Sequence, residues 1–472
     1  MYHRFSFFFF QSEEKKEKDK DSEILGKLLR MRTHIILISG IVCAFCTPPS
    51  QIRITFGPSE AELIAGWTTL GVSSLSHVQS GKSPSLLDTN SSGSLITFGN
   101  EYCPNNSTRT SHMAPFPAAP GRETYYRVSS DGLNWSDVFA VVNPLRSFPM
   151  RVALWGDLGV ECGGVLPRSP GFAGGQCTAV PQLALDSAAG MHDFTIHFGD
   201  TAYNMDERCG NKGDFFLDAA SSFSAHRPHV YSCGNHESSG DLKPYTEFTH
   251  RLGYPQTPLA TASGSKNNRW MLWEVGPVTF VSLDPDAWIY PLCYDLLDEQ
   301  YAWLEGAMKG IDRTRTPWIV FLVHRASYCT KTTDPECNSE AEALRYGQLG
   351  TRAPLEKLLA AYGVDFYFSG HTHHYERTFP VLRGVATQTN YSEPRGTVHI
   401  QSGIAGTGPG DEFTVPKAPW EAFRDEDYYP TYGRLTLFNH THALYEQLYN
   451  DNGTVFDSFL LVNSQSNHGA PF

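Results

Sequence analysis

Five short apolar runs constrain this chain most, because each ends in glycine or histidine beside a polar side chain. Residues 194–198 read as a buried strand and lead into Gly199, Asp200 and Tyr203. A helical turn beginning there would direct Asp200 and Tyr203 to the same side. A carboxylate and a phenol aimed at one point suit a hard trivalent metal ion. Taken alone, the segment is equally well explained by a turn aspartate and a core tyrosine.

The other four runs end in the same manner. Residues 151–155 are followed by Asp157, residues 229–232 by Asn235 and His236, residues 318–323 by His324, and residues 364–368 by His371 and His373. If the five strands are parallel neighbours, their ends lie at one edge of a sheet. Turn chemistry hardly explains five such ends on successive strands, so the sequence predicts a metal site.

The types of side chain indicate the chemistry of this site. The set contains two aspartates, one asparagine, three histidines and one tyrosine, which suits iron, manganese or zinc better than a metal that prefers thiolates. Seven ligands are too many for one ion but suit two ions that share a carboxylate. Two ions roughly 3.5–4 Å apart hold a phosphoryl group and convert water to hydroxide.

The rest of the sequence predicts two folded parts. Residues 49–147 contain short strands separated by turn signals, which favours a small antiparallel β-sandwich of fibronectin-like type. Residues 150–465 alternate strands with helical stretches and become strand-rich towards the end. The predicted fold class is therefore α/β (α+β), with a β-sandwich flanked by helices in the second part.

The first 48 residues read as a targeting segment. Residues 31–48 resemble a secretory signal peptide, and residues 1–30 are expected to be disordered or to arise from a misplaced start codon. The apolar run at 35–45 is too short to span a bilayer, although an anchor that stays attached is the alternative. No second long apolar run follows, so we expect no stable membrane insertion. The compartment is then secreted, vacuolar or lysosome-like.

Cysteines and glycosylation sequons agree with this route. Eight cysteines follow the signal, and we expect a disulfide between Cys329 and Cys337, with Cys162 and Cys177 as a second candidate pair. The predicted glycosylation sites are Asn90, Asn106, Asn134, Asn390, Asn439 and Asn452.

The formal net charge of −13 argues against a nucleic-acid partner. It leaves a phosphate substrate open, since metal ions supply positive charge locally. An oligomer is possible.

The strand-end motifs carry a resemblance to a known family. The segments that begin at Gly156, Gly199, Gly234, His324 and Gly370 resemble the metallophosphoesterase signature. Tyr203 narrows the resemblance to purple acid phosphatases, and the fibronectin-like part resembles their long form. The resemblance covers about residues 51–463. It implies an acid phosphatase that hydrolyses phosphate monoesters with a dinuclear Fe(III)–M(II) centre and a metal-bound hydroxide nucleophile.

The resemblance also implies the role of each side chain. Asp157, Asp200, Tyr203 and His373 would bind a ferric ion, and Asp200, Asn235, His324 and His371 a divalent iron, zinc or manganese ion. Asn235 and His236 would contact the phosphate, and His236 would protonate the leaving group. A histidine that only holds a ligand loop is the alternative for His236.

One segment departs from the plant forms of this family. They carry two histidines in the loop after the strand that ends in His324, whereas residues 326–348 contain none. Arg325 or Tyr328 is the expected substitute as a substrate contact. Two other functions remain open. One is a phosphodiesterase or nucleotide pyrophosphatase of the same superfamily, and the other is a secreted, non-catalytic binding protein.

Overall fold

The structure is a computed structural model of the 472-residue chain. It describes residues 48–99, 103, 107–159, 179–238, 245–290, 293–330, 335–407, 413, 416–427 and 429–464. The predicted extension at 1–30, nearly all of the predicted signal at 31–48, and Cys162, Cys177 and Asn106 lie outside these residues. Within them, no helix is both long and apolar enough to cross a membrane.

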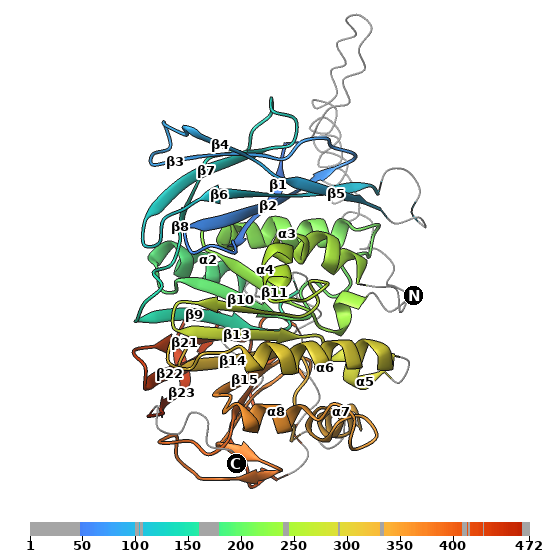
Figure 1. Ribbon diagram of the computed structural model, residues 1–472, viewed down its shortest axis with the longest axis vertical. Helices are drawn as coiled ribbons and strands as arrows, with labels where there is room; N and C mark the ends of the chain where they lie inside the picture. Colours follow the sequence, from blue (N-terminus) through green and yellow to red (C-terminus); the bar gives the residue numbers. More distant parts are fainter. Residues whose placement is uncertain are drawn as a thin grey trace, which may run out of the picture. The chain divides into compact units, whose positions relative to one another are not determined.

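The amino-terminal strands form two four-stranded antiparallel sheets, as the sequence predicted (Figure 1). One has the order β1 (Ser50–Phe56), β2 (Glu62–Leu70), β6 (Arg109–Pro117), β5 (Ser94–Phe98). The other has the order β4 (Thr89–Ser92), β3 (His77–Gly81), β7 (Glu123–Ser129), β8 (Phe139–Val142). Trp67, Val78, Phe116 and Tyr126 are fully buried in their core. Apolar residues in alternation on facing strands explain this packing.

Two larger mixed sheets follow, which confirms the predicted α/β class. The first has the order β11 (His229–Ser232), β10 (Phe194–Phe198), β9 (Met150–Trp155), β21 (Thr431–Leu437), β22 (His442–Tyr449), β23 (Val455–Val462). Its first three strands are parallel, and the remaining strands pair antiparallel.

The second large sheet contains the other two strands that end in metal-ligand motifs. It has the order β12 (Met271–Val275), β13 (Val278–Leu283), β14 (Trp318–Val323), β15 (Phe366–Ser369), β19 (Val398–Ser402), β16 (Tyr375–Thr378), β20 (Glu421–Arg424). The sheets share one apolar core, in which the Phe194 and Phe280 rings lie 5.7 Å apart and those of Phe198 and Phe368 6.0 Å apart. The condition that all five strands are neighbours in one sheet is therefore not met, and the two sheets form the predicted β-sandwich.

Helices cover the outer faces of these two sheets. The helices α2 (Val180–Ala189) and α3 (Asn211–Ser224) pack on the first sheet, where Leu183 and Phe216 share a core with Trp155. The helices α6 (Tyr294–Lys309), α7 (Pro335–Tyr346) and α8 (Leu355–Ala361) pack on the second. The sequence predicted helical stretches in this part of the chain but treated 326–348 as a loop, so α7 is a correction. Strong helix formers in its second half account for the helix.

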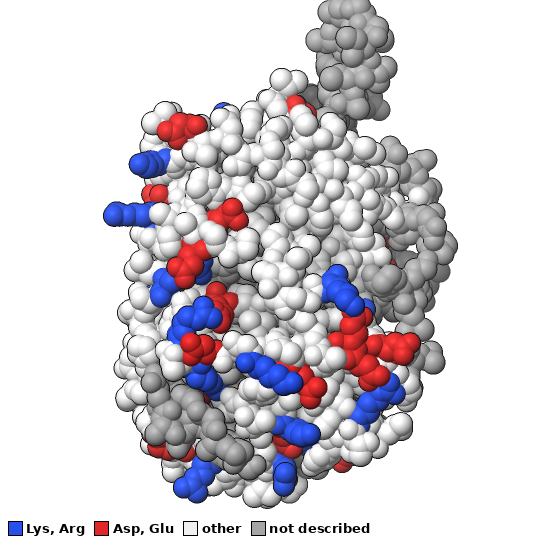
Figure 2. Space-filling view, viewed as in Figure 1, with Lys and Arg blue, Asp and Glu red and all other residues white. Residues whose placement is uncertain are grey.

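Short helices and strands complete the described chain. They are η1 (Asn235–Ser238), η2 (Phe248–Leu252), η3 (Tyr254–Gln256), α4 (Thr257–Ala262), α5 (Asp286–Ile289), and the hairpin β17 (Val381–Leu382) and β18 (Val385–Ala386). On the face drawn in Figure 2, acidic and basic side chains are interspersed, and no extended basic patch is visible.

The amino-terminal sheets are joined to the first large sheet. Cys103 forms a disulfide with Cys209, Arg109 donates to Asp214, and Ile54 bridges to Pro228. The sequence did not predict these links, because side-chain pairing across so many residues has no local signature. The predicted disulfide between Cys329 and Cys337 is present. The domain limits at 147 and 150 stay a prediction.

Candidate metal centre

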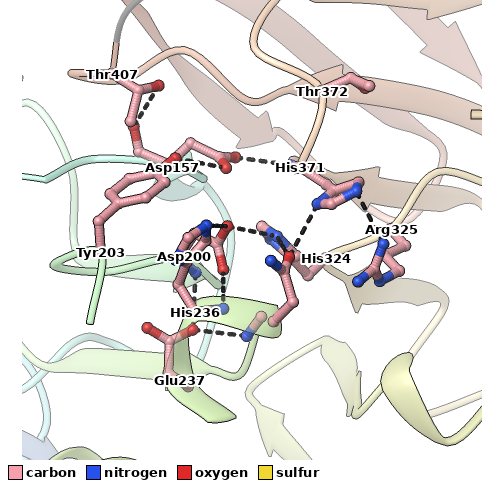
Figure 3. Close-up of polar contacts among 12 residues, drawn as sticks. Asp157, Asp200, Tyr203, His236, Glu237, His324, Arg325, His371, Thr372 and Thr407 are labelled. Atoms are coloured by element: carbon pink, nitrogen blue, oxygen red, sulfur yellow. Dashed lines mark hydrogen bonds and ion pairs between the residues drawn. The ribbon is translucent and has the colours of Figure 1, made fainter. Parts of the chain in front are cut away.

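The ends of β9, β10 and β11 meet the ends of β14 and β15 across the two large sheets (Figure 3). Hydrogen bonds tie the two sides together. The backbone N–H of His371 donates to Asp157 Oδ2 over 2.9 Å, and His324 Nδ1 lies 3.1 Å from the carbonyl oxygen of Phe198. The five predicted strand ends therefore converge, although two sheets supply them.

The ligand segments have an unusual backbone. Asp157, Asp200, Tyr203 and His371 have φ values of 60°, 52°, 55° and 73°, in the left-handed region. Such a conformation costs a residue with a side chain about 1–2 kcal/mol. It also means that no helical turn begins at Asp200, so the condition under which a helical turn would align Asp200 with Tyr203 is not met. The sharp turns direct these side chains back towards the strand ends, which is a common property of functional sites.

Two glycines allow the strand ends to approach closely. A Cβ atom on Gly199, which has a φ of 100°, would lie 2.6 Å from His324 Nδ1. A Cβ atom on Gly370 would overlap with Asp157 Oδ2. These two glycines are thus required by packing between the ends of β9, β10, β14 and β15 as well as by turn geometry.

Three of the predicted ligands form one group. Tyr203 Oη lies 2.9 Å from Asp157 Oδ1 and 2.9 Å from His373 Nε2. His373 Nε2 lies 3.4 Å from the same oxygen of Asp157. A phenol, a carboxylate and an imidazole thus present three donor atoms to one another at the separation expected around a single ion.

The other predicted ligands form a second group beside the first. His324 Nε2 lies 3.2 Å from Asp200 Oδ2 and 3.2 Å from Asn235 Oδ1, and His371 Nδ1 lies 2.9 Å from that same Asn235 oxygen. Donor atoms of Asp200, His324 and His371 all fall within 4.8 Å of one another. In Figure 3, Asp200 lies between Tyr203 and His324, which is the place of a carboxylate shared by both groups.

Burial and mutual charge set the protonation of these groups. Burial opposes ionisation of Asp200, but His324, His236 and His371 outweigh it and hold the pKa of this carboxyl well below its ordinary value. Burial lowers the pKa of His324, yet Asp200 and Asp157 raise it to about 9. A cation that binds His324 must therefore displace a proton, so its binding depends on pH.

Tyr203 and His371 show the opposite tendencies. Burial, with Asp157 and Asp200 beside it, raises the pKa of the Tyr203 phenol well above its ordinary value. Burial and the Arg325 guanidinium lower the pKa of His371 well below its ordinary value. The site therefore offers a neutral imidazole at His371 and a phenol that needs a strong cation beside it to ionise.

The donor set fits a pair of metal ions. All seven predicted ligands converge, and their donor atoms are carboxylate, amide, phenol and imidazole groups that hard or intermediate cations prefer. The contact of His324 Nδ1 with the carbonyl of Phe198 leaves Nε2 directed at Asp200, as expected of an imidazole ligand.

His236 lies at the open side of the site. Its side chain is 35% exposed, and its ring packs on Tyr203 with a centroid distance of 4.6 Å. Its backbone N–H donates to Asp200 Oδ1 over 2.9 Å, and its Nε2 lies 3.9 Å from Asp200 Oδ2. Among the predicted site residues, it thus combines exposure with direct contact to the carboxylate between the two groups.

Glu237 supports the site and was missed by the sequence reasoning. Its side chain is buried and accepts hydrogen bonds from the backbone N–H groups of Asp200, Thr201 and Gly234 at 2.7–2.8 Å. It also accepts from the Thr201 hydroxyl at 2.7 Å. One carboxylate thereby satisfies the loop amides of both β10 and β11. Its position directly after His236 was the only signal in the sequence.

The two expected substitutes for the plant histidines lie elsewhere. Arg325 is buried; its Nε donates to Asp286 Oδ1 over 3.0 Å, and its Nη1 contacts Glu340 and His371. Tyr328 is also buried, and its hydroxyl donates to Glu356. Arg325 therefore lies behind His371 instead of facing the open side, and Tyr328 packs against His399 and Trp420. Neither position supports a direct substrate contact.

Comparison with known proteins agrees with this geometry. A model of calcineurin-like phosphoesterases matches residues 150–375, and one of the C-terminal part of iron/zinc purple acid phosphatase-like proteins matches 396–458. Acid phosphatase type 7 of Danio rerio is 31% identical over 444 residues, which cover 90% of this chain and 93% of that protein. A nucleotide pyrophosphatase/phosphodiesterase of Hordeum vulgare is 27% identical over 352 residues, 71% of this chain and 89% of that protein.

A solved structure supports the fold. The purple acid phosphatase PPD1 from seeds of yellow lupin, Lupinus luteus, superimposes with a TM-score of 0.67 at 22% identity, over 90% of this chain and 76% of that one. Because the relative from Danio rerio matches nearly over its whole length, the chain belongs to the purple acid phosphatase family of calcineurin-like phosphoesterases.

Proposed function

We propose that this phosphatase hydrolyses phosphate monoesters at acidic pH with a ferric ion and a divalent ion of iron, zinc or manganese. The family implies a dinuclear centre, and the position of Tyr203 favours a ferric ion in it. Its hydroxyl oxygen lies 2.9 Å from donor atoms of both Asp157 and His373, and this single observation carries the proposal. A phenolate ligand stabilises a trivalent ion and gives it colour.

Each of the two groups of side chains would bind one of the two ions. Asp157, Tyr203 and His373, with Asp200, would hold the ferric ion. Asn235, His324 and His371, with Asp200, would hold the divalent ion. The placement of Asp200 between the groups in Figure 3 supports its role as the shared ligand. When bound, the ions would polarise the phosphoryl group and make hydroxide available below neutral pH.

His236 is the proposed catalytic residue of the chain. Its contact with Asp200 and its partial exposure support a role in which Nε2 lies within reach of a substrate oxygen. It would donate a proton to the leaving-group oxygen, as general acids do when they are positioned within hydrogen-bond reach. The side-chain amide of Asn235, which contacts His324 and His371 in the second group, would help to orient the phosphate.

A phosphodiesterase or nucleotide pyrophosphatase is the second candidate, favoured by the relative from Hordeum vulgare. Assays of the purified protein with p-nitrophenyl phosphate and bis(p-nitrophenyl) phosphate, combined with metal analysis, separate the two. We expect faster hydrolysis of the monoester and about two metal ions per chain. A preference for the diester would favour the second candidate, and a protein that binds no metal would favour a non-catalytic binding role.

We further propose passage through the secretory pathway to a secreted, vacuolar or lysosome-like location. Two disulfides among the described residues support it, since disulfides persist in oxidising compartments. The asparagines of five predicted sequons are exposed and thus accessible to glycosylation: Asn90, Asn134, Asn390, Asn439 and Asn452. Digestion of the expressed protein with an endoglycosidase tests this, and an unchanged mass would contradict it.

A further inference from the structure

The edge of the His371 ring that carries Nε2 contacts a buried ion-pair network. Its Nδ1 faces Asn235 and the second ligand group at 2.9 Å. Its Nε2, on the opposite side, lies 2.8 Å from Arg325 Nη1 and 3.5 Å from Glu340 Oε2. Figure 3 shows Arg325 beside His371 on the side away from Asp200. One nitrogen thus belongs to the ligand group and the other to the network.

The chemistry of the imidazole assigns the partner of Nε2. A neutral imidazole that offers the Nδ1 lone pair to a cation carries its proton on Nε2. In this structure Nε2 accepts from Arg325 Nη1 and Nδ1 donates to Asn235 Oδ1. A cation on Nδ1 would move the proton to Nε2, and the guanidinium, which only donates hydrogen bonds, cannot accept it. The Glu340 carboxylate only accepts when ionised, and it lies on the same side of the ring. Glu340 is therefore the hydrogen-bond acceptor that suits the Nε2 proton of a His371 ring bound to a cation through Nδ1.

Arg325 holds Glu340 in this place. Its Nη1 contacts Glu340 Oε1, while its Nε donates to Asp286 Oδ1 over 3.0 Å. Asp286 also accepts from the Tyr245 hydroxyl over 2.8 Å. The guanidinium is thus fixed between two buried carboxylates, and its charge compensates that of Glu340.

The helix α7 is fixed at the same point. Glu340 lies three residues after Cys337, whose disulfide with Cys329 joins the helix to the segment after β14. Further along α7, Arg345 donates to the carbonyl oxygen of Ser327 over 2.7 Å. These links set the position of Glu340 relative to His371, although the sequence in this segment showed only the absence of the plant histidines.

We propose that Glu340, held by Arg325, is a positioning residue that accepts the Nε2 proton of His371 and thereby directs Nδ1 at the divalent ion. This rests on the proposed function, in which His371 binds that ion. Carboxylates behind metal-binding histidines orient the ring and raise its basicity, and their loss weakens metal affinity by about 10–100-fold. Glu340 on α7 thus acts on the divalent ion from behind His371.

Equilibration of the full-length protein with buffered Zn²⁺ tests the proposal. We expect the Zn²⁺ concentration at half-occupancy to rise about 10–100-fold in Glu340→Ala, with unchanged iron content and unchanged visible absorption. Glu340→Gln keeps an acceptor oxygen and should show a smaller rise. Glu342→Ala, at an exposed position on the same helix, is the matched control and should bind Zn²⁺ as the wild type does.

Two outcomes for the Glu340→Ala variant overturn the proposal. One is a Glu340→Ala variant with wild-type Zn²⁺ affinity. The other is loss of iron and Zn²⁺ together with a lower melting temperature, because a merely structural role of Glu340 in α7 predicts that pattern. If the alanine variant does not fold, a Glu340→Gln variant with wild-type affinity overturns it instead. A wild-type protein without Zn²⁺ uptake or monoester hydrolysis would refute the proposed function, whereas an active wild type beside an unchanged Glu340→Ala refutes only the role of Glu340.

Discussion

Asn204 Oδ1 lies 2.9 Å from His236 Nδ1, and Glu207 determines which end of the Asn204 amide faces the imidazole. Asn204 Nδ2 donates to Glu207 Oε1 over 2.7 Å, which leaves the amide oxygen for His236. An ionised carboxylate only accepts, so the reverse orientation of the amide would bring its oxygen against Glu207 and lose that hydrogen bond. His236 Nδ1 therefore donates to Asn204, and Nε2 remains directed towards Asp200.

We expect Asn204→Ala to lower kcat of monoester hydrolysis by about 10-fold, the upper range for one hydrogen bond. The metal content should stay unchanged, because Asn204 lies behind His236 and not among the proposed ligands. Asn204→Asp keeps an acceptor oxygen and should retain more activity than the alanine variant. Steady-state kinetics with metal analysis of both variants provide the measurement. Equal activity of Asn204→Ala and wild type would show that His236 needs no such partner.

Tyr203→Phe removes the phenol that the iron assignment depends on. We expect the variant to lose the visible absorption band at equal iron content and to keep part of its phosphatase activity. The physical reason is that the band requires a phenolate bound to iron, whereas the other ligands still hold both ions. Absorption spectra of wild type and variant, normalised to iron, provide the check. An unchanged spectrum would refute the phenolate ligand.

Glu237→Gln should destabilise the fold through the loops of β10 and β11. One carboxylate oxygen accepts from the N–H groups of Asp200 and Gly234, and the other from the N–H and hydroxyl of Thr201. An amide NH₂ in place of either oxygen would face two donors. We expect a loss of roughly 2–5 kcal/mol in the free energy of unfolding, measured by denaturant titration. Glu342→Gln, on the exposed side of α7, serves as the control. Equal stability of the Glu237 variant and this control would contradict the prediction.

Two buried histidines away from the metal ligands should make the fold sensitive to acid. Burial lowers the pKa of His192 to about 3 and that of His399 to about 3. Both folded values lie below the unfolded value of about 6.5. Each residue's contribution to stability is therefore fully present above pH 6.5 and is lost as the pH falls towards 3.

The size of this effect follows from the two pKa values. At pH 4.5, each histidine should reduce the free energy of unfolding by about 3 kcal/mol relative to pH 7. His399→Phe removes one titrating group and keeps an aromatic ring against Tyr328 and Tyr367. Denaturant titrations at pH 7 and pH 4.5 should show a smaller difference for this variant than for the wild type. An equal difference would mean that His399 does not titrate with unfolding.

The convergence of the seven predicted ligands could be predicted because its signal is local. Each of them lies within a few residues of an apolar run that reads as a buried strand, as for Asp200 after β10 and His324 after β14. The arrangement of these strands was not predictable from the same signal. Whether β11 pairs with β10 or with β14 depends on contacts between distant residues, and a strand end reads alike in either sheet.

The residues that contact the predicted ligands from behind could not be predicted from the sequence, for a different reason. Glu237 and Glu340 are single acids, and nothing local separates them from acids on a solvated surface. Their roles come from where the left-handed turn at Asp200 and the disulfide-linked helix α7 place other groups. The same holds for Arg325, whose position after His324 suggested a substrate contact although its side chain turns inward to Asp286.

The disulfide between Cys103 and Cys209 bears on how far this chain can be shortened from its amino terminus. Cys209 lies shortly after Tyr203 and Asn204, so the loop that carries the phenol is crosslinked to a segment between β5 and β6. Arg109 of β6 also neutralises Asp214 in the same region. A fragment that begins at β9 would leave Asp214 without Arg109 and the Tyr203 loop untethered. The amino-terminal sheets of this chain therefore help to hold the Tyr203 loop in place, although they supply none of the predicted ligands.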